Sequence, residues 1–79
     1  MMMYKETISE VLVFKTDILH EQSVDAIATV FDNDPRIRKW NIDREDIDRV
    51  LRVEAEQVSA LEIKLVVNAA GFYCEELPD

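Results

Sequence analysis

The sequence has few of the residues that build disulfide scaffolds and membrane spans. It contains a single cysteine, Cys74, which cannot form an internal disulfide. The chain therefore needs no oxidising compartment, and the cytoplasm is its expected location. No apolar run approaches the roughly 18 residues of a membrane span. The amino end, Met1 to Glu6, has no apolar region of the signal-peptide type. We therefore expect neither export nor membrane association.

Basic residues are also scarce. Nine Lys and Arg stand against seventeen Asp and Glu, which gives a net charge of -8. This charge repels a phosphate backbone, and the chain has no Lys/Arg stripe that could neutralise one. Nucleic acid is therefore not an expected partner. The acidity favours solubility, and it could also steer the protein towards a basic patch on another protein.

The composition that remains is that of one small folded domain. The chain has 79 residues, of which 48% are apolar and 33% are charged. This balance supports a single core and argues against disorder. No linker, repeat or low-complexity tract is visible. We expect one domain over 1–79 with a core over about 8–77.

The first half of the chain predicts a strand followed by a helix. The β-branched and aromatic run 8–14 is typical of a buried strand. The helix should start within 17–21, where an acidic or hydroxyl side chain can cap it, and should end before Pro35. Its buried face is indicated by apolar residues at helical spacing: Val24, Ile27, Ala28 and Phe31.

A hairpin is predicted next. Trp40 and Ile42 define one face of a short strand, and the irregular step from Ile37 to Trp40 indicates a bulge or a late strand start. Turn-forming residues over 41–46 then lead into a second strand over 50–53.

The last part of the chain predicts a second helix and a final strand. Ser59 and Glu62 form a capping box, in which each side chain accepts the other residue's backbone amide. Gly71 is placed to close the helix in a left-handed conformation, and a short strand over 72–77 ends at Pro78. The buried stripe of the helix is Ile63, Val66, Val67 and Ala70.

The predicted order is strand, helix, strand, strand, helix, strand. This is the βαββαβ order of the ferredoxin-like α+β sandwich. Right-handed crossovers would place both helices on one face of a four-stranded antiparallel sheet.

Two stretches resemble a known family. The run from Pro35 to Asp43 (PRIRKWNID) is similar to the helix-to-strand passage of the heavy-metal-associated (HMA) domains of copper chaperones and metal-pumping ATPases. The run from Ala69 to Phe72 (AAGF) is similar to their closing helix-to-strand turn. The resemblance covers most of the chain and implies the ferredoxin-like fold. Arg36 departs from the family, which usually has Gly there.

The resemblance also locates the family's metal loop, Met-x-Cys-x-x-Cys. Counting back from Asp43 without a gap places Ile18 near the Met, and His20 and Ser23 near the two cysteines. Cu(I) prefers thiolates, which a helix start favours electrostatically. His20 and Ser23 cannot replace that pair, so we expect no bound metal and no cofactor.

A noncysteine metal site is the weaker alternative. His20 could bind copper or zinc if Asp17, Glu21 or a second subunit completed the ligand set. We interpret His20 chiefly as an exposed residue of the first helical turn. Cys74 is expected to pack in the core or at an edge. The tripled Met at positions 1–3 is interpreted as a start-site feature rather than a thioether copper site.

Other acidic groups predict no calcium site and no catalysis. The loop 43–48 lacks the Gly that an EF-hand requires at its sixth position, where Asp48 stands. We expect a solvated turn with ion pairs. Glu75 and Glu76 point to opposite sides of a strand and lack a partner base or nucleophile. The protein is therefore not expected to be an enzyme.

Two aromatic residues are candidates for an interaction surface, namely Trp40 and Tyr73. The competing interpretation is that Trp40 and Phe72 are core residues. Alternation directs Tyr73 opposite to Phe72 and Cys74, so one of these sets faces the helices and the other faces the open side of the sheet. An aromatic on that open side would be a dimer or partner contact.

Two functions remain after these exclusions. The first is a non-catalytic HMA-like domain that has lost its metal-binding cysteines and serves as a protein-interaction or regulatory module. It would contact an unknown protein or a second copy of itself through the open sheet face or an edge. The alternative is a copper- or zinc-binding or transport protein with a site near His20. A small-molecule sensor that dimerises through its sheet is a weaker third. The missing cysteine pair favours the first.

Overall fold

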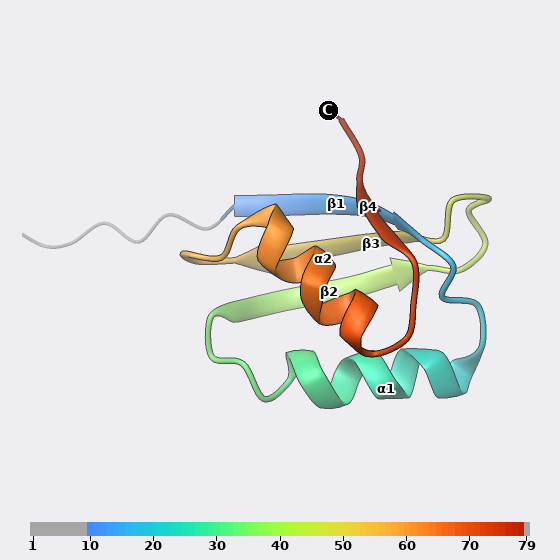
Figure 1. Ribbon diagram of the computed structural model, residues 1–79, viewed down its shortest axis with the longest axis horizontal. Helices are drawn as coiled ribbons and strands as arrows, with labels where there is room; N and C mark the ends of the chain where they lie inside the picture. The colour runs from blue at the N-terminus through green and yellow to red at the C-terminus, as the bar shows by residue number, and fades with distance from the viewer. Residues whose placement is uncertain (1–9, 79) are drawn as a thin grey trace, which may run out of the picture.

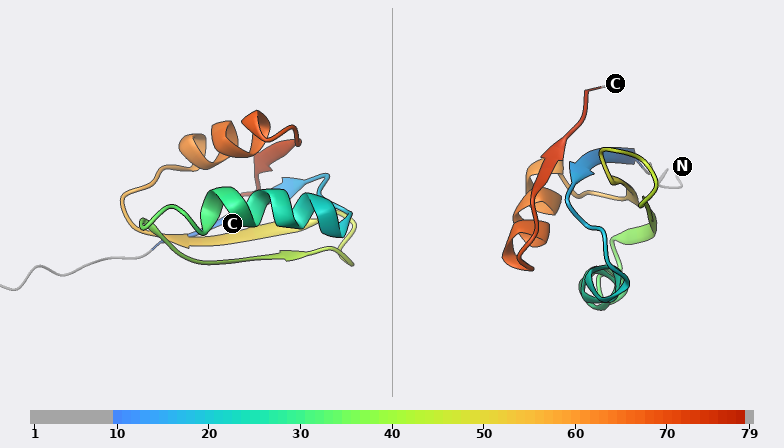
Figure 2. Two further views of the ribbon diagram at one scale, coloured as in Figure 1. Left: turned by 90° about the horizontal axis from the view of Figure 1, so that it is seen from below. Right: turned by 90° about the vertical axis from the view of Figure 1, so that its right-hand side faces the viewer.

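The protein is a two-layer sandwich of one sheet and two helices (Figure 1). The structure is a computed structural model that describes residues 10–78. A four-stranded antiparallel sheet has the order β2-β3-β1-β4, and both helices lie on the same side of it (Figure 2). The elements in chain order are β1 (Glu10–Thr16), α1 (Glu21–Phe31), β2 (Ile37–Asp43), β3 (Val50–Ala55), α2 (Ala60–Ala69) and β4 (Cys74–Glu76). The predicted ferredoxin-like order is confirmed.

Three strands have boundaries that differ from the prediction. The strand predicted over 50–53 continues to Ala55. The first strand continues to Thr16, and residues 8 and 9 of the predicted run lie outside the described residues. The last strand covers only Cys74–Glu76. It starts late because the two preceding backbone amides are already bonded elsewhere: Phe72 N–H donates to the Val67 carbonyl, and Tyr73 N–H donates to the Asp17 carboxylate.

The irregular step in β2 is a bulge, one of the two alternatives that its spacing indicated. Ile37 pairs with Ala55 and Lys39 pairs with Glu54, so Arg38 is the extra residue on this strand. Beyond the bulge, Trp40 lies opposite Val53, a fully buried residue of β3. The bulge therefore restores the alternation that places Trp40 on the helix side of the sheet.

Helix α1 starts and ends where the sequence predicts, but it begins without a side-chain cap. His20 is the N-cap residue, and no side chain bonds the free amides there. The expectation that an acidic or hydroxyl group within 17–21 would cap this helix is wrong. Asp17, the nearest such group on the preceding loop, accepts the amide of Tyr73 instead.

Half of the predicted capping box of α2 forms. The Ser59 hydroxyl accepts the Glu62 amide at 3.1 Å. The Glu62 carboxylate does not return to Ser59, because it pairs with the Arg36 guanidinium at 2.7 Å. Gly71 closes the helix with φ +101°, a left-handed conformation that is strained for residues with a Cβ atom.

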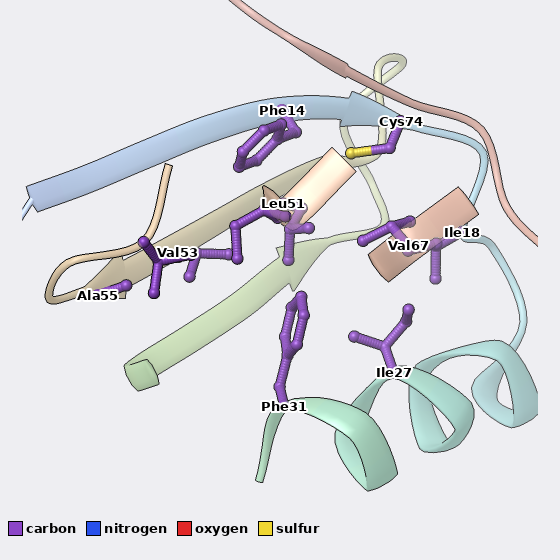
Figure 3. Packing of buried hydrophobic residues seen from close by; sticks show 11 residues of the cluster. Phe14, Ile18, Ile27, Phe31, Leu51, Val53, Ala55, Val67 and Cys74 are labelled. Atoms are coloured by element: carbon purple, nitrogen blue, oxygen red, sulfur yellow. The ribbon is translucent and has the colours of Figure 1, made fainter. Parts of the chain in front are cut away.

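The core lies between the helices and the inner face of the sheet (Figure 3). Ile27 and Phe31 point from α1 towards the sheet, and the Phe31 ring meets Trp40 edge-on with centroids 5.6 Å apart. The buried apolar side chains are Phe14, Ile18, Ile27, Phe31, Val50, Leu51, Val53, Ala55, Val58, Ile63, Val67 and Cys74.

Candidate functional site

Three connections meet at one end of the sheet, and they form the candidate site. Because β1 runs antiparallel to β3 and β4, its last residue lies beside the first residues of those strands. The segments 17–20, 44–49 and 70–73 therefore lie together at that end, which we call the loop end (Figure 1). By the resemblance, the family's metal loop begins in the first of these segments, at Ile18, and extends into α1 at Ser23.

Thr16 joins two of the three segments. It is the one buried polar side chain among residues 10–78. Its hydroxyl donates to the Arg49 carbonyl at 2.6 Å and accepts the Ile18 amide at 3.1 Å. Its own amide donates to the Asp48 carbonyl at 3.0 Å. These hydrogen bonds hold the β1–α1 loop against the β2–β3 loop.

The residues at the family's metal positions point in different directions. Ile18 is fully buried in the core. His20 is exposed at the helix start, and its carbonyl accepts the amides of Ser23 and Val24 at 2.9 and 3.1 Å. Ser23 is half-buried on the first turn of α1. No cysteine lies in this loop.

Asp17, the proposed second ligand, is engaged elsewhere. Its Oδ1 atom accepts the Tyr73 amide at 2.9 Å, and this bond fastens the entry to β4. Within residues 10–78, no three His, Cys, Asp or Glu side chains lie close enough together to hold a metal ion.

The single cysteine lies in the core. Cys74 is only 1% exposed and points into the core from the start of β4 (Figure 3). Burial away from water raises the pKa of its thiol to about 11, so the thiol is neutral at pH 7. A neutral, covered thiol is a poor metal ligand.

Apolar and cationic side chains mark the surface of the loop end. Leu19 is 44% exposed and Ile47 is 89% exposed. Together they line a shallow hollow with Thr16, Asp17 and Arg49. Sequence reasoning missed both apolar residues. A signal was present, because Ile47 is an isolated aliphatic residue inside an acidic turn and Leu19 lies outside the apolar stripe of α1.

The acidic turn stabilises itself, as expected for a solvated hairpin. Asp43 accepts the amide of Glu45 at 3.1 Å, and Asp46 accepts the amide of Asp48 at 2.8 Å. Asp48 also pairs with Lys15 of β1 at 3.7 Å. Turn geometry and an ion pair therefore engage several of the carboxylates that first suggested a cation site.

Trp40 and Tyr73, the predicted interaction residues, lie at opposite edges of the sheet. Trp40 belongs to edge strand β2, packs against the core and donates its indole N–H to Asp32 at 3.0 Å. Tyr73 precedes the other edge strand, is 46% exposed and donates its hydroxyl to Glu75 at 2.7 Å. That bond to the carboxylate raises the pKa of Tyr73. The two rings do not share one surface.

Solved structures of HMA domains have this fold. The apo HMA domain of the copper chaperone for superoxide dismutase aligns with a TM-score of 0.77 and 13% identity, over 99% of this chain and 76% of that one. The Atx1-Cu(I)-Ccc2a complex aligns with a TM-score of 0.74 and 21% identity, over 87% of this chain and 96% of that one. The yeast copper transporter domain Ccc2a aligns over the same shares with a TM-score of 0.71 and 21% identity.

These TM-scores establish the fold as that of HMA domains, and the expected fold class is thereby confirmed. No protein-family profile matches the sequence, and no curated protein matches it. Within residues 10–78, no helix is both long and apolar enough to cross a membrane.

Replacing Thr16 tests whether its hydroxyl organises the loop end. Thr16→Val keeps the shape but leaves the Ile18 amide and the Arg49 carbonyl without this partner, so we expect a loss of about 2–3 kcal/mol in unfolding free energy. Thr16→Ser keeps the hydroxyl and should lose about 1 kcal/mol through the missing methyl group. Urea unfolding followed by far-UV circular dichroism measures both variants, and equal losses would contradict this role.

Proposed function

We propose that this protein is a non-catalytic HMA-like domain that has given up thiolate metal binding and serves as a protein-interaction module through its loop end. The observation that carries the proposal is where the side chains that could bind a metal lie in the fold. The only cysteine is buried in the core, while His20 and Ser23 stand at the start of α1, at the positions that correspond to the family's metal ligands. Such a module works in the cytoplasm, because its single thiol requires no oxidising compartment.

A protein partner is supported by one of the structural neighbours. The Atx1-Cu(I)-Ccc2a structure is, by its name, a complex of two proteins with Cu(I). A domain of the same fold without the cysteine pair would need other contacts to hold a partner. The loop end supplies exposed apolar area at Leu19 and Ile47. A cation lies next to it, because the Arg44 guanidinium donates to the Leu19 carbonyl at 3.4 Å.

The loop end is suited to binding because it is already ordered. Thr16 and Asp17 fix its backbone through bonds to the neighbouring segments. A preorganised surface loses less conformational entropy on association than a flexible one. Apolar side chains held on such a surface favour a protein partner over a hydrated ion.

Metal titration separates this proposal from the noncysteine metal site. We expect the purified, tag-free protein to form no stoichiometric complex with Cu(I), Zn(II) or Ni(II) at micromolar concentration, because His20 has too few ligands beside it. Native mass spectrometry and thermal unfolding read out binding and stabilisation together. A one-to-one complex that raises the melting temperature and disappears in His20→Ala would restore the metal-binding function and contradict the proposal.

A comparative capture experiment tests the surface itself. The immobilised protein is incubated with an extract of its source cells, alongside a Leu19→Ser/Ile47→Ser double variant. We expect a protein that the wild type retains to be lost from the variant, since the double change removes the exposed apolar area of the hollow. Quantitative mass spectrometry measures the difference.

The matched control for capture is Leu61→Ser. Leu61 is 62% exposed near the start of α2 and is not part of the loop end. Its variant should retain the same protein as the wild type. If all three baits retain identical sets of proteins, the loop end is not the binding surface.

A further inference from the structure

The uncovered face of the sheet has a pattern of its own, separate from the loop end. Both helices lie on the other side, so no helix covers the side chains that alternate away from the core (Figure 2). Val11 is 59% exposed. The central part of this face, here called the open patch, consists of Val11, Val13, Lys39, Asn41, Arg52 and Glu54.

The open patch is arranged in two rows across three strands. In the first row, Glu54 of β3 lies opposite Val11 of β1 on one side and opposite Lys39 of β2 on the other, in the register of the sheet. In the second row, Arg52 of β3 lies opposite Val13 of β1 and opposite Asn41 of β2. Opposite charges therefore stand two residues apart on the central strand, on the same face.

None of these three charged side chains forms an ion pair within the described part of the chain. The ion pairs among residues 10–78 involve Lys15, Arg36 and Arg38, and none involves Arg52, Lys39 or Glu54. The patch also contains two cations and one carboxylate in a protein of net charge -8. It is thus a region where a second, equally acidic copy can approach without local repulsion.

A two-fold axis makes the open patch complementary to itself. We infer that two copies associate face to face through the open patch, about an axis that runs across the strands midway between the two rows. This axis lays each row on the other row of the second copy. Arg52 of one copy then meets Glu54 of the second copy, the reverse pair forms by symmetry, and Val11 meets Val13. An axis along the strands would instead place Arg52 on Arg52 and repel.

The size of the patch sets the strength of this dimer. Three or four strands spaced about 4.8 Å apart, with roughly five residues of 3.3 Å each, cover only a few hundred Å² per copy. Stable interfaces bury about 800 Å² per partner. The dimer should therefore be weak and reversible, with a dissociation constant of roughly tens to hundreds of micromolar.

Charge exchange at the two central residues tests the dimer. Sedimentation equilibrium from about 20 μM to 1 mM should show a growing dimer fraction for the wild type. Arg52→Glu leaves two carboxylates on the patch, both on β3. Glu54→Arg leaves three cations there, two of them on β3. Each variant alone should associate at least about tenfold more weakly, because like charges then face each other.

An equimolar mixture of the two variants gives the decisive result. In the mixed dimer each acidic position faces a basic one, so association should return to the wild-type level. A mixture that is no more dimeric than its components would overturn the inference, and so would a wild type that stays monomeric at about 1 mM.

Two controls keep the result specific. Lys64→Glu changes the net charge as Arg52→Glu does, but on α2, and should dimerise like the wild type. The Leu19→Ser/Ile47→Ser variant should also dimerise normally, because the loop end is a different surface. Dimerisation lost in either control would place the contact outside the open patch. If a charge variant fails to fold by circular dichroism, Arg52→Gln and Glu54→Gln replace it, and unchanged dimerisation in both would refute the pairing.

Discussion

The hydroxyl of Thr16 is the interaction on which the candidate site depends. It is buried, and it satisfies a carbonyl of the β2–β3 loop and an amide of the β1–α1 loop at the same time. A buried polar group without partners costs free energy, so both loops must keep these positions for the fold to be stable. The site is therefore ordered by the protein's own hydrogen bonds.

The same constraint determines what the loop can present to solvent. With the Ile18 amide held by Thr16, the Ile18 side chain enters the core, and its neighbour Leu19 is left partly exposed. His20 begins the helix without a cap, and Asp17 turns towards Tyr73. The residues that could have formed a ligand set thus diverge, while two aliphatic side chains share a hollow on the surface. This arrangement supports a contact with protein more than coordination of an ion.

Periodicity predicted the architecture well because burial enforces it. Apolar spacing fixed the order of the elements, the irregular step at Ile37 indicated the bulge, and Gly71 marked the end of α2. The prediction failed where a side chain had competing partners. Glu62 binds Arg36 instead of returning to Ser59, and Asp17 binds the backbone before β4 instead of capping α1. Such choices depend on residues distant in sequence, and Leu19 and Ile47 became neighbours only through the fold.

Amide hydrogen exchange at Ile18 tests the central claim that the loop end is ordered without metal. The measurement is made by NMR on the metal-free protein and repeated with Cu(I) and with Zn(II). We predict strong protection of the Ile18 amide in the metal-free protein, because it is buried and bonded to Thr16, with no change when either ion is added. Rapid exchange at Ile18 that slows only after metal is added would contradict this interpretation.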